Sequence, residues 1–309
     1  MSNFNCDSFE QIEKNLDRLF VPKYYPGFIL SIYENGNESF FLNKGYDDIS
    51  KKIEYKKDSI FRIYSMTKPI VSTAAMQLIE NKKLALDDDV TKYIPEWDDA
   101  VFYKSNNKNV ITIKDLFTHT SGLTYAFQGQ SEVDKKYKVS GINSIVDSEL
   151  SSQEIINELS NIPLEFSPGS FYNYSISIDI LGFIIERISN KTLNEYLHEN
   201  IFNTLGMKDT AFTLDISKTE RLAMCYRWDE NKNKYEVHDL KINPNIEVKS
   251  YLKKPSSYSG GAGLLSTMND YQLFGSALLD AKKGRKNPLI NKETANLMMK
   301  NHLPNNKHI

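Results

Sequence analysis

The sequence has little of several features that mark whole classes of protein. It contains only two cysteines, Cys6 and Cys225, which lie far apart and without the spacing of metal ligands. This excludes a disulfide framework and a zinc site, and it favours two buried or inert thiols. Charge of one sign is not in excess either, because 38 basic and 40 acidic residues give a formal net charge of −2. We therefore expect no nucleic acid partner.

Long hydrophobic runs are missing as well. No segment approaches the roughly 18 consecutive apolar residues of a membrane span, and residues 1–6 lack the apolar stretch of a signal peptide. We predict a cytoplasmic protein that does not associate with membranes. What the chain does have is 309 residues, of which 40% are hydrophobic and 12% aromatic. That is enough to bury a large core, in one large domain or in two lobes.

Hydrophobic spacing predicts the first elements. Apolar residues recur at helical intervals from Phe9 to Phe20, which predicts an amphipathic helix. Residues 28–33 and 39–42 predict the two strands of a hairpin. Residues 66 to 213 are typical of a mostly helical segment, and a further helix is expected over residues 268–279. The sequence contains no internal repeat and no low-complexity tract.

Ser65 and Lys68 form the first chemical motif. Their S-x-x-K spacing places Ser65 at the start of a predicted helix and Lys68 one turn later on the same face. Pro69 fits the first helical turn, where a missing N–H is harmless. A serine hydroxyl becomes a nucleophile when a neighbouring base removes its proton, and a lysine is such a base where desolvation or a nearby cation favours its neutral form. Alone, the pair also fits a solvated helix start.

Tyr174 belongs to a second motif. A turn at Pro168 and Gly169 leads through aromatic residues to this tyrosine, just before an apolar helix that includes Ile180. A tyrosine in such a loop can reach into a cleft, and a phenol beside a lysine ammonium can serve as general base and acid. The alternative is a buried aromatic side chain whose hydroxyl has one hydrogen-bond partner.

Taken together, these motifs resemble the serine β-lactamase and penicillin-binding-protein superfamily, and within it the class C β-lactamase branch that includes the family VIII carboxylesterases. The resemblance covers nearly the whole chain. Its landmarks follow in the family's order, at residues 61–69, 86–90, 93–95, 116–123, 174–177, 201–210 and 260–264. That many ordered matches is a specific signal.

The resemblance implies an α+β fold of the β-lactamase/transpeptidase type, with an antiparallel sheet flanked by helices and a helical lobe. We expect one catalytic domain over residues 1–309. Its α/β lobe would comprise residues 1–65 and 214–309, and its helical lobe residues 66–213. Neither a cofactor nor a metal is implied.

The resemblance also assigns roles to residues. Ser65 would be the acylated nucleophile, Lys68 its activating partner, and Tyr174 the shared general base and leaving-group acid. Ile176 stands where class C β-lactamases usually carry an asparagine, which counts against efficient lactam hydrolysis, and Tyr64 before the nucleophile is similar to the esterase branch. We therefore expect a serine hydrolase for small esters or amides, most of all an esterase, with weak or no β-lactamase activity.

One landmark of the superfamily is not found. In relatives a Lys-Thr-Gly motif, or a variant of it, lies late in the sequence on an edge strand that lines the cleft. Here Lys191 and Thr192 are followed by leucine, and His119 and Thr120 by serine. We expect the last strands and the final helix to be absent, which would remove an oxyanion donor, impair catalysis and leave a sheet edge open to self-association. A truncated gene product, part of a longer enzyme and a partner chain that completes the sheet all remain open.

Other candidate sites are weaker. His119 lacks the Gly-x-Ser-x-Gly elbow of Ser-His-Asp hydrolases and fits a structural histidine in a turn. Residues 87–89 are aspartates without further ligands at fixed spacing and predict a polar turn, and residues 260–263 predict a tight turn rather than a phosphate loop. Two other functions stay open. One is a catalytically impaired scaffold of the same fold, and the other is an enzyme similar to D-alanyl peptidases, which the missing export signal disfavours.

Overall fold

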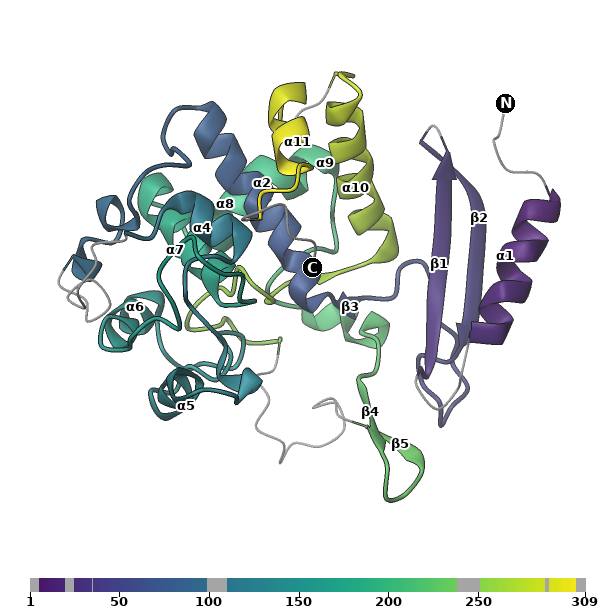
Figure 1. Cartoon of the computed structure of the whole chain (residues 1–309). Helices are drawn as coiled ribbons and strands as arrows, with labels where there is room; N and C mark the ends of the chain where they lie inside the picture. Colours follow the sequence, from purple (N-terminus) through teal and green to yellow (C-terminus); the bar gives the residue numbers. More distant parts are fainter. Residues whose placement is uncertain are drawn as a thin grey trace.

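A hairpin with one helix stands beside a larger helical body in Figure 1. The structure is a computed structural model of the chain, and it describes residues 6–19, 25–34, 36–98, 110–237, 251–286 and 289–303. The strands are β1 (Gly27–Glu34), β2 (Asn37–Gly45), β3 (Phe61–Arg62), β4 (Tyr226–Asp229), β5 (Lys234–Val237) and β6 (Leu265–Ser266).

Helices make up most of the regular secondary structure in the described chain. The α-helices are α1 (Cys6–Leu19), α2 (Thr67–Glu80), α4 (Ile113–Thr118), α5 (Glu132–Val139), α6 (Ser152–Leu159), α7 (Ser177–Ser189), α8 (Leu193–Leu197), α9 (Asn203–Leu205), α10 (Met268–Lys282) and α11 (Lys292–Met298). Short 3-10 turns are η1 (Tyr64–Met66), η2 (Val90–Lys92), η3 (Pro95–Trp97), η4 (Ala126–Gln128) and η6 (Ile216–Arg221), and η5 (His198–Phe202) is a π-helical turn.

The N-terminal hairpin and its helix form a small packed unit. β1 and β2 pair antiparallel. The ring of Phe9 in α1 stacks on Phe40 in β2 with the ring centroids 5.0 Å apart. Lys44 of β2 forms ion pairs with two carboxylates of α1. The predicted helix and both predicted strands are thus confirmed, whereas Phe20 lies outside the described residues.

Helix α2 runs through the middle of the helical body in Figure 1. Its residues Ile70, Val71 and Ala74 are fully buried, and it packs against α7, whose Ile180 and Leu181 are fully buried as well. A large aliphatic side chain contributes about 1.5–3 kcal/mol when it is fully buried. This packing fixes the residues at the start of α2 relative to those that precede α7.

Several described helices of the body begin with the same short sequence device. A Ser or Thr at the N-cap accepts a backbone hydrogen bond from the third helical residue, whose acidic side chain binds back to the cap. The pairs are Thr112 with Asp115, Ser131 with Asp134, Ser151 with Glu154, and Thr192 with Glu195. Because such a cap is worth about 0.5–2 kcal/mol, these sequences set the points at which the helices start.

The short strand β3 connects the start of α2 to a distant part of the chain. β3 pairs antiparallel with β6. Just after β3, the N–H of Ile63 donates a hydrogen bond to the carbonyl of Leu264 at 3.1 Å. The glycine turn of residues 260–263, which precedes β6, is therefore held beside Ser65.

The expected antiparallel sheet is present in the form of small sheets. Within the described residues each sheet holds two strands, in the pairs β1–β2, β3–β6 and β4–β5. The architecture is therefore a mixed α+β one, as predicted, with helices as its main component. None of the described helices is long and apolar enough to cross a membrane. The division into lobes at residues 65 and 213 stays a prediction.

Candidate active site

Ser65 lies in the 3-10 turn η1, immediately before α2. Its side chain is exposed, and the preceding residue, Tyr64, has a φ of +40°. A left-handed backbone is unfavourable for tyrosine and is found where the surrounding structure requires it. The predicted helix is confirmed, with the refinement that α2 itself starts at Thr67 and Ser65 stands in the turn that leads into it.

Lys68 is the centre of the site. Its side chain is only 8% exposed, and its Nζ contacts four oxygen atoms: Tyr174 Oη at 2.7 Å, the Gly261 carbonyl at 2.8 Å, and Ser65 Oγ and Tyr125 Oη at 3.3 Å each. A lysine ammonium has three protons to donate and accepts none. All four of these oxygen atoms can therefore accept a hydrogen bond from this side chain.

Tyr174 completes the group. Its hydroxyl forms a hydrogen bond with Ser65 Oγ and also contacts Lys68 Nζ. The backbone carbonyl of Tyr174 accepts from Gln128 Nε2 at 2.5 Å, and its ring lies 4.9 Å from the imidazole of His119. The structure therefore brings together the three residues that the sequence singled out, and their chemical roles stay a prediction.

His119 contacts the loop that carries Tyr174. It is the C-cap of α4 with a left-handed backbone, and its Nδ1 accepts a hydrogen bond from the backbone N–H of Ser175 at 3.2 Å. Burial, followed by the charge of Lys68, lowers the pKa of His119 to about 3. The side chain is therefore a neutral imidazole, and its contacts fit the structural role that the sequence predicted.

A buried carboxylate was missed by the sequence reasoning. Asp179 of α7 is 1% exposed and accepts hydrogen bonds from Ser259 Oγ at 2.6 Å, the Gly261 N–H at 2.9 Å and Tyr125 Oη at 3.4 Å. Burial raises the pKa of Asp179, while these donors and the charge of Lys68 oppose that rise. A lone acidic residue in the apolar stripe of α7 is the signal that could have identified it, whereas Tyr125 carries no such signal.

The turn at residues 260–263 requires glycine because other groups approach it closely. A Cβ at Gly260 would lie 2.7 Å from the carbonyl oxygen of Ile178. A Cβ at Gly261 would overlap the Asp179 carboxylate and lie 2.9 Å from the Tyr125 hydroxyl. The predicted tight turn is confirmed, and it also presents a carbonyl to Lys68.

The family follows from comparison with known proteins. Residues 16–306 match the family model described as Beta-lactamase. The chain belongs to the beta-lactamase family. The resemblance and the β-lactamase/transpeptidase-like fold that the sequence motifs predicted are both confirmed by this match and by solved structures of the same fold.

Relatives of this beta-lactamase-family chain include an esterase. Protein Rv1367c of Mycobacterium tuberculosis is 35% identical over 244 residues, which cover 76% of this chain and 57% of the relative. Esterase EstB of Burkholderia gladioli is 29% identical over 275 residues, which cover 84% of this chain and 67% of the esterase. The structure of EstCE1, a hydrolase with promiscuous acyltransferase activity, matches with a TM-score of 0.75 at 25% identity and covers 92% of this chain and 73% of EstCE1. The chain thus spans little more than half the length of Rv1367c.

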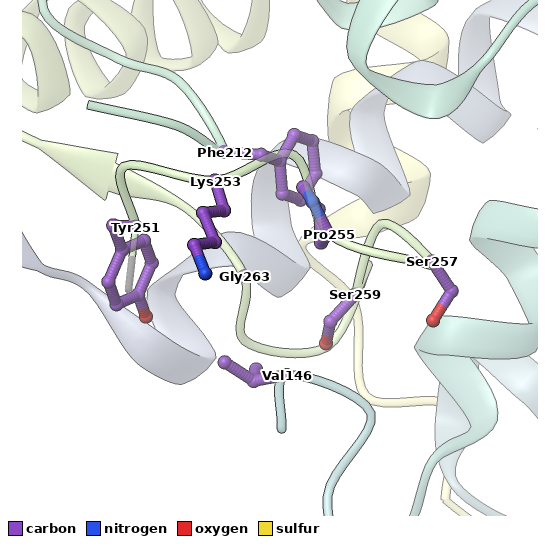
Figure 2. Close-up of a pocket in the computed structure, with 8 residues that line it drawn as sticks. All are labelled: Val146, Phe212, Tyr251, Lys253, Pro255, Ser257, Ser259 and Gly263. Carbon is purple, nitrogen blue, oxygen red and sulfur yellow. The ribbon is translucent and has the colours of Figure 1, made fainter. Parts of the chain in front are cut away.

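A small pocket adjoins the glycine turn of the beta-lactamase-family site. Its volume is about 30 Å³, and Figure 2 shows the residues that line it: Val146, Phe212, Tyr251, Lys253, Pro255, Ser257, Ser259 and Gly263. Ser259 and Gly263 flank Gly261, whose carbonyl contacts Lys68. The lining combines apolar surfaces with hydroxyl groups and one ammonium group, and its volume gives room for little more than water.

Metal ligands do not gather anywhere in the part of this beta-lactamase-family chain that the structure describes. The aspartates at 87–89 form the polar turn that the sequence predicted: Asp88 Oδ2 accepts from the Ala85 N–H at 2.8 Å, and Asp89 Oδ1 accepts from the Thr91 N–H at 2.9 Å. Hydrogen bonds to the backbone therefore account for these two carboxylates.

Proposed function

We propose that this beta-lactamase-family chain is a serine hydrolase that acts through an acyl-enzyme at Ser65, and that its substrates are small carboxylic esters. One observation carries the proposal: the buried Nζ of Lys68 contacts both the exposed hydroxyl of Ser65 and the hydroxyl of Tyr174. The two hydroxyls also bond to each other. A nucleophile, its proton acceptor and a stabilising cation are thus in contact.

Acylation follows from these contacts. Ser65 Oγ attacks the ester carbonyl carbon while its proton passes to the deprotonated oxygen of Tyr174, which the Lys68 ammonium stabilises from 2.7 Å. The C–O bond to the leaving group then breaks, and Tyr174 returns the proton to the departing alkoxide. An acyl-serine and an alcohol result, and Tyr174 is again deprotonated. Proton transfer of this kind typically contributes about 10²–10⁴-fold in rate.

Deacylation repeats the same steps with water. Tyr174 removes a proton from a water molecule that attacks the acyl carbon, and Ser65 Oγ leaves with that proton. The carboxylic acid is released and the starting site is restored. The exposed position of Ser65 supports this step, because water and substrate reach the same oxygen atom.

Ile176 supports esters over β-lactams as substrates. It is the N-cap of α7, and its side chain is 1% exposed within the main core. It therefore offers no polar group to a lactam amide, whereas an ester needs only an attacked carbonyl and a protonated leaving oxygen. The name of the relative EstB also supports an esterase.

A substrate panel tests the proposal. We expect the purified chain to hydrolyse p-nitrophenyl acetate and butyrate, to hydrolyse nitrocefin at least about 10²-fold more slowly, and to lose ester hydrolysis in Ser65→Ala. Ser50→Ala, at a serine whose hydroxyl donates to Asp48 in a turn after β2, serves as the matched control. Hydrolysis that persists in Ser65→Ala, or a folded chain without esterase activity, would contradict the proposal, and the second result would favour a scaffold. Faster cleavage of a D-alanyl dipeptide than of any ester would favour a peptidase.

A further inference from the structure

Asp179 is an acidic side chain in the centre of an apolar core. It lies on α7 between Ile178 and Ile180, and all three residues are at most 2% exposed. A buried carboxylate is costly unless it is well hydrogen-bonded or paired with a cation. Its position in the core therefore calls for a physical explanation that packing does not supply.

The partners of Asp179 are donors. Ser259 Oγ and the Gly261 N–H donate to Oδ1 at 2.6 and 2.9 Å, and Tyr125 Oη donates to Oδ2 at 3.4 Å. An ionised carboxylate only accepts hydrogen bonds. The arrangement therefore fits the carboxylate form of Asp179. In it, the hydroxyl proton of Tyr125 is donated to Asp179.

Two of these partners contact Lys68 on their other side. The Gly261 carbonyl accepts from Lys68 Nζ at 2.8 Å, and Tyr125 Oη accepts at 3.3 Å. A peptide carbonyl is far too weak a base to take the proton of an ammonium ion, and the Tyr125 oxygen still carries its own proton. Neither group can therefore remove a proton from Lys68, and both stabilise the charged side chain.

We propose that Asp179 is a positioning residue that keeps Lys68 an ammonium ion through Gly261 and Tyr125, so that Tyr174 rather than Lys68 removes the proton of Ser65. The inference rests on the proposed acyl-enzyme function and adds the group that sets the protonation of its base.

The charged and titratable groups around Lys68 come from several elements. Tyr125 precedes η4, Tyr174 precedes α7, and His119 ends α4. His119 is neutral, because burial and Lys68 lower its pKa to about 3, and burial beside Asp179 raises the pKa of Tyr125 far above its usual value. Asp179 is thus the anion that balances Lys68 in this group of residues.

The pH dependence of Ser65 reactivity tests the inference. The rate of phosphonylation by a fluorophosphonate is measured from pH 5 to pH 10 by intact mass, for the wild-type chain and for Asp179→Asn. The amide keeps an acceptor for Ser259 and Gly261 but removes the negative charge. We expect both limbs of the pH profile to move to lower pH by about one unit, because loss of an anion favours the deprotonated forms of the Lys68–Tyr174 pair.

Two matched variants separate charge from packing. Asp134→Asn alters another buried aspartate, 2% exposed, whose partners are Thr124 and the backbone of residues 130–131, and we expect its limbs to stay in place. Ile178→Val trims a buried apolar side chain next to Asp179 in the sequence but keeps all three donors to the carboxylate, so its limbs should also stay in place even if the chain becomes less stable. Thermal unfolding of each variant is measured alongside.

The outcomes distinguish the inference from the proposed function. If the wild-type chain is labelled and the limbs of the Asp179→Asn profile do not shift, the inference is overturned and the proposed function is retained. A wild-type chain that is not labelled at any pH would overturn the proposed function and this inference with it. If Asp179→Asn does not fold, Tyr125→Phe is used instead, since it removes the hydroxyl that joins Lys68 to Asp179. A smaller shift in the same direction is then expected, and no shift would overturn the inference.

Discussion

At the scale of single residues, the site pairs an exposed hydroxyl with a buried amine. Lys68 is 8% exposed, whereas Ser65 stands in an exposed turn. The two side chains are three residues apart, and Tyr174 joins them from the loop before α7. In the proposed mechanism, this arrangement leaves the nucleophile open to substrate, and the burial of Lys68 strengthens the electrostatic effect of its ammonium group.

His119 gives a pH-dependent stability that can be measured. Its pKa is about 3 in the folded chain, lowered mainly by burial, against about 6.5 when unfolded. Because the unfolded chain binds the proton more readily, this contribution is fully present above pH 6.5 and is lost as the pH falls toward 3. Going from pH 8 to pH 5 should lower the free energy of unfolding by about 2 kcal/mol through this side chain.

Urea unfolding of the wild type and of His119→Asn at both pH values checks this prediction. Asparagine tolerates the left-handed backbone, φ +54°, and its Oδ1 can accept the Ser175 N–H. The wild type should lose about 2 kcal/mol more than the variant between pH 8 and pH 5. Equal losses in the two proteins would show that His119 has an ordinary affinity for protons in the folded state.

Single residues also mark the limit of what the sequence could predict about the site. Ser65 and Lys68 were identified because their contact is local and has a fixed spacing. Tyr125 and Gly261 contact Lys68 from 57 and 193 residues away in the sequence. No spacing rule joins such residues, since only the tertiary fold brings them together. Their contribution therefore became evident from the structure alone.

At the scale of elements, the glycine turn of residues 260–263 connects α2 to α7. It supplies a carbonyl to Lys68 and an N–H to Asp179. Gly261→Ala should lower the free energy of unfolding by about 1–3 kcal/mol, because its methyl group would overlap Asp179 and Tyr125. It should also slow labelling of Ser65 by moving the carbonyl away from Lys68.

Gly275 provides the matched control for that variant. It is an exposed glycine within α10, and a Cβ there would meet nothing within 4 Å. Gly275→Ala should raise the free energy of unfolding by about 1 kcal/mol, because alanine is the better helix former, and leave labelling unchanged. Chemical unfolding and fluorophosphonate labelling of both variants give the comparison. A Gly261→Ala chain as stable and reactive as the wild type would contradict the close approach described for the turn.

Elements were predictable to different degrees. Helix α1 and the β1–β2 hairpin followed from hydrophobic spacing, and α2 from the pattern around Lys68. Strands β3 and β6 have two residues each and pair across the chain, so their positions depend on tertiary contacts rather than on any local pattern. The 3-10 turn that contains Ser65 also lacks a local sequence pattern, because Tyr64 adopts a left-handed backbone there.

At the scale of the whole molecule, the order of the sequence landmarks was sufficient to predict the family and the fold. The missing late motif predicts fewer strands, but the pairing of the described strands into sheets of two did not follow from the order of the landmarks. Strand β1 pairs there with β2 alone. Self-association through this edge, and the division into two lobes, stay predictions, since both concern how whole surfaces meet rather than how a motif is spaced.

The proposed role of Ser65 as nucleophile is tested most directly by the intact mass of the folded chain after exposure to a fluorophosphonate, with Ser65→Ala as the control. We expect one adduct per chain, located by peptide mapping at Ser65 and absent from the variant, because Lys68 and Tyr174 contact this hydroxyl. Folding of both proteins is checked by circular dichroism. A folded wild-type chain without an adduct, or an adduct that persists in Ser65→Ala, would contradict the assignment of Ser65 as the nucleophile.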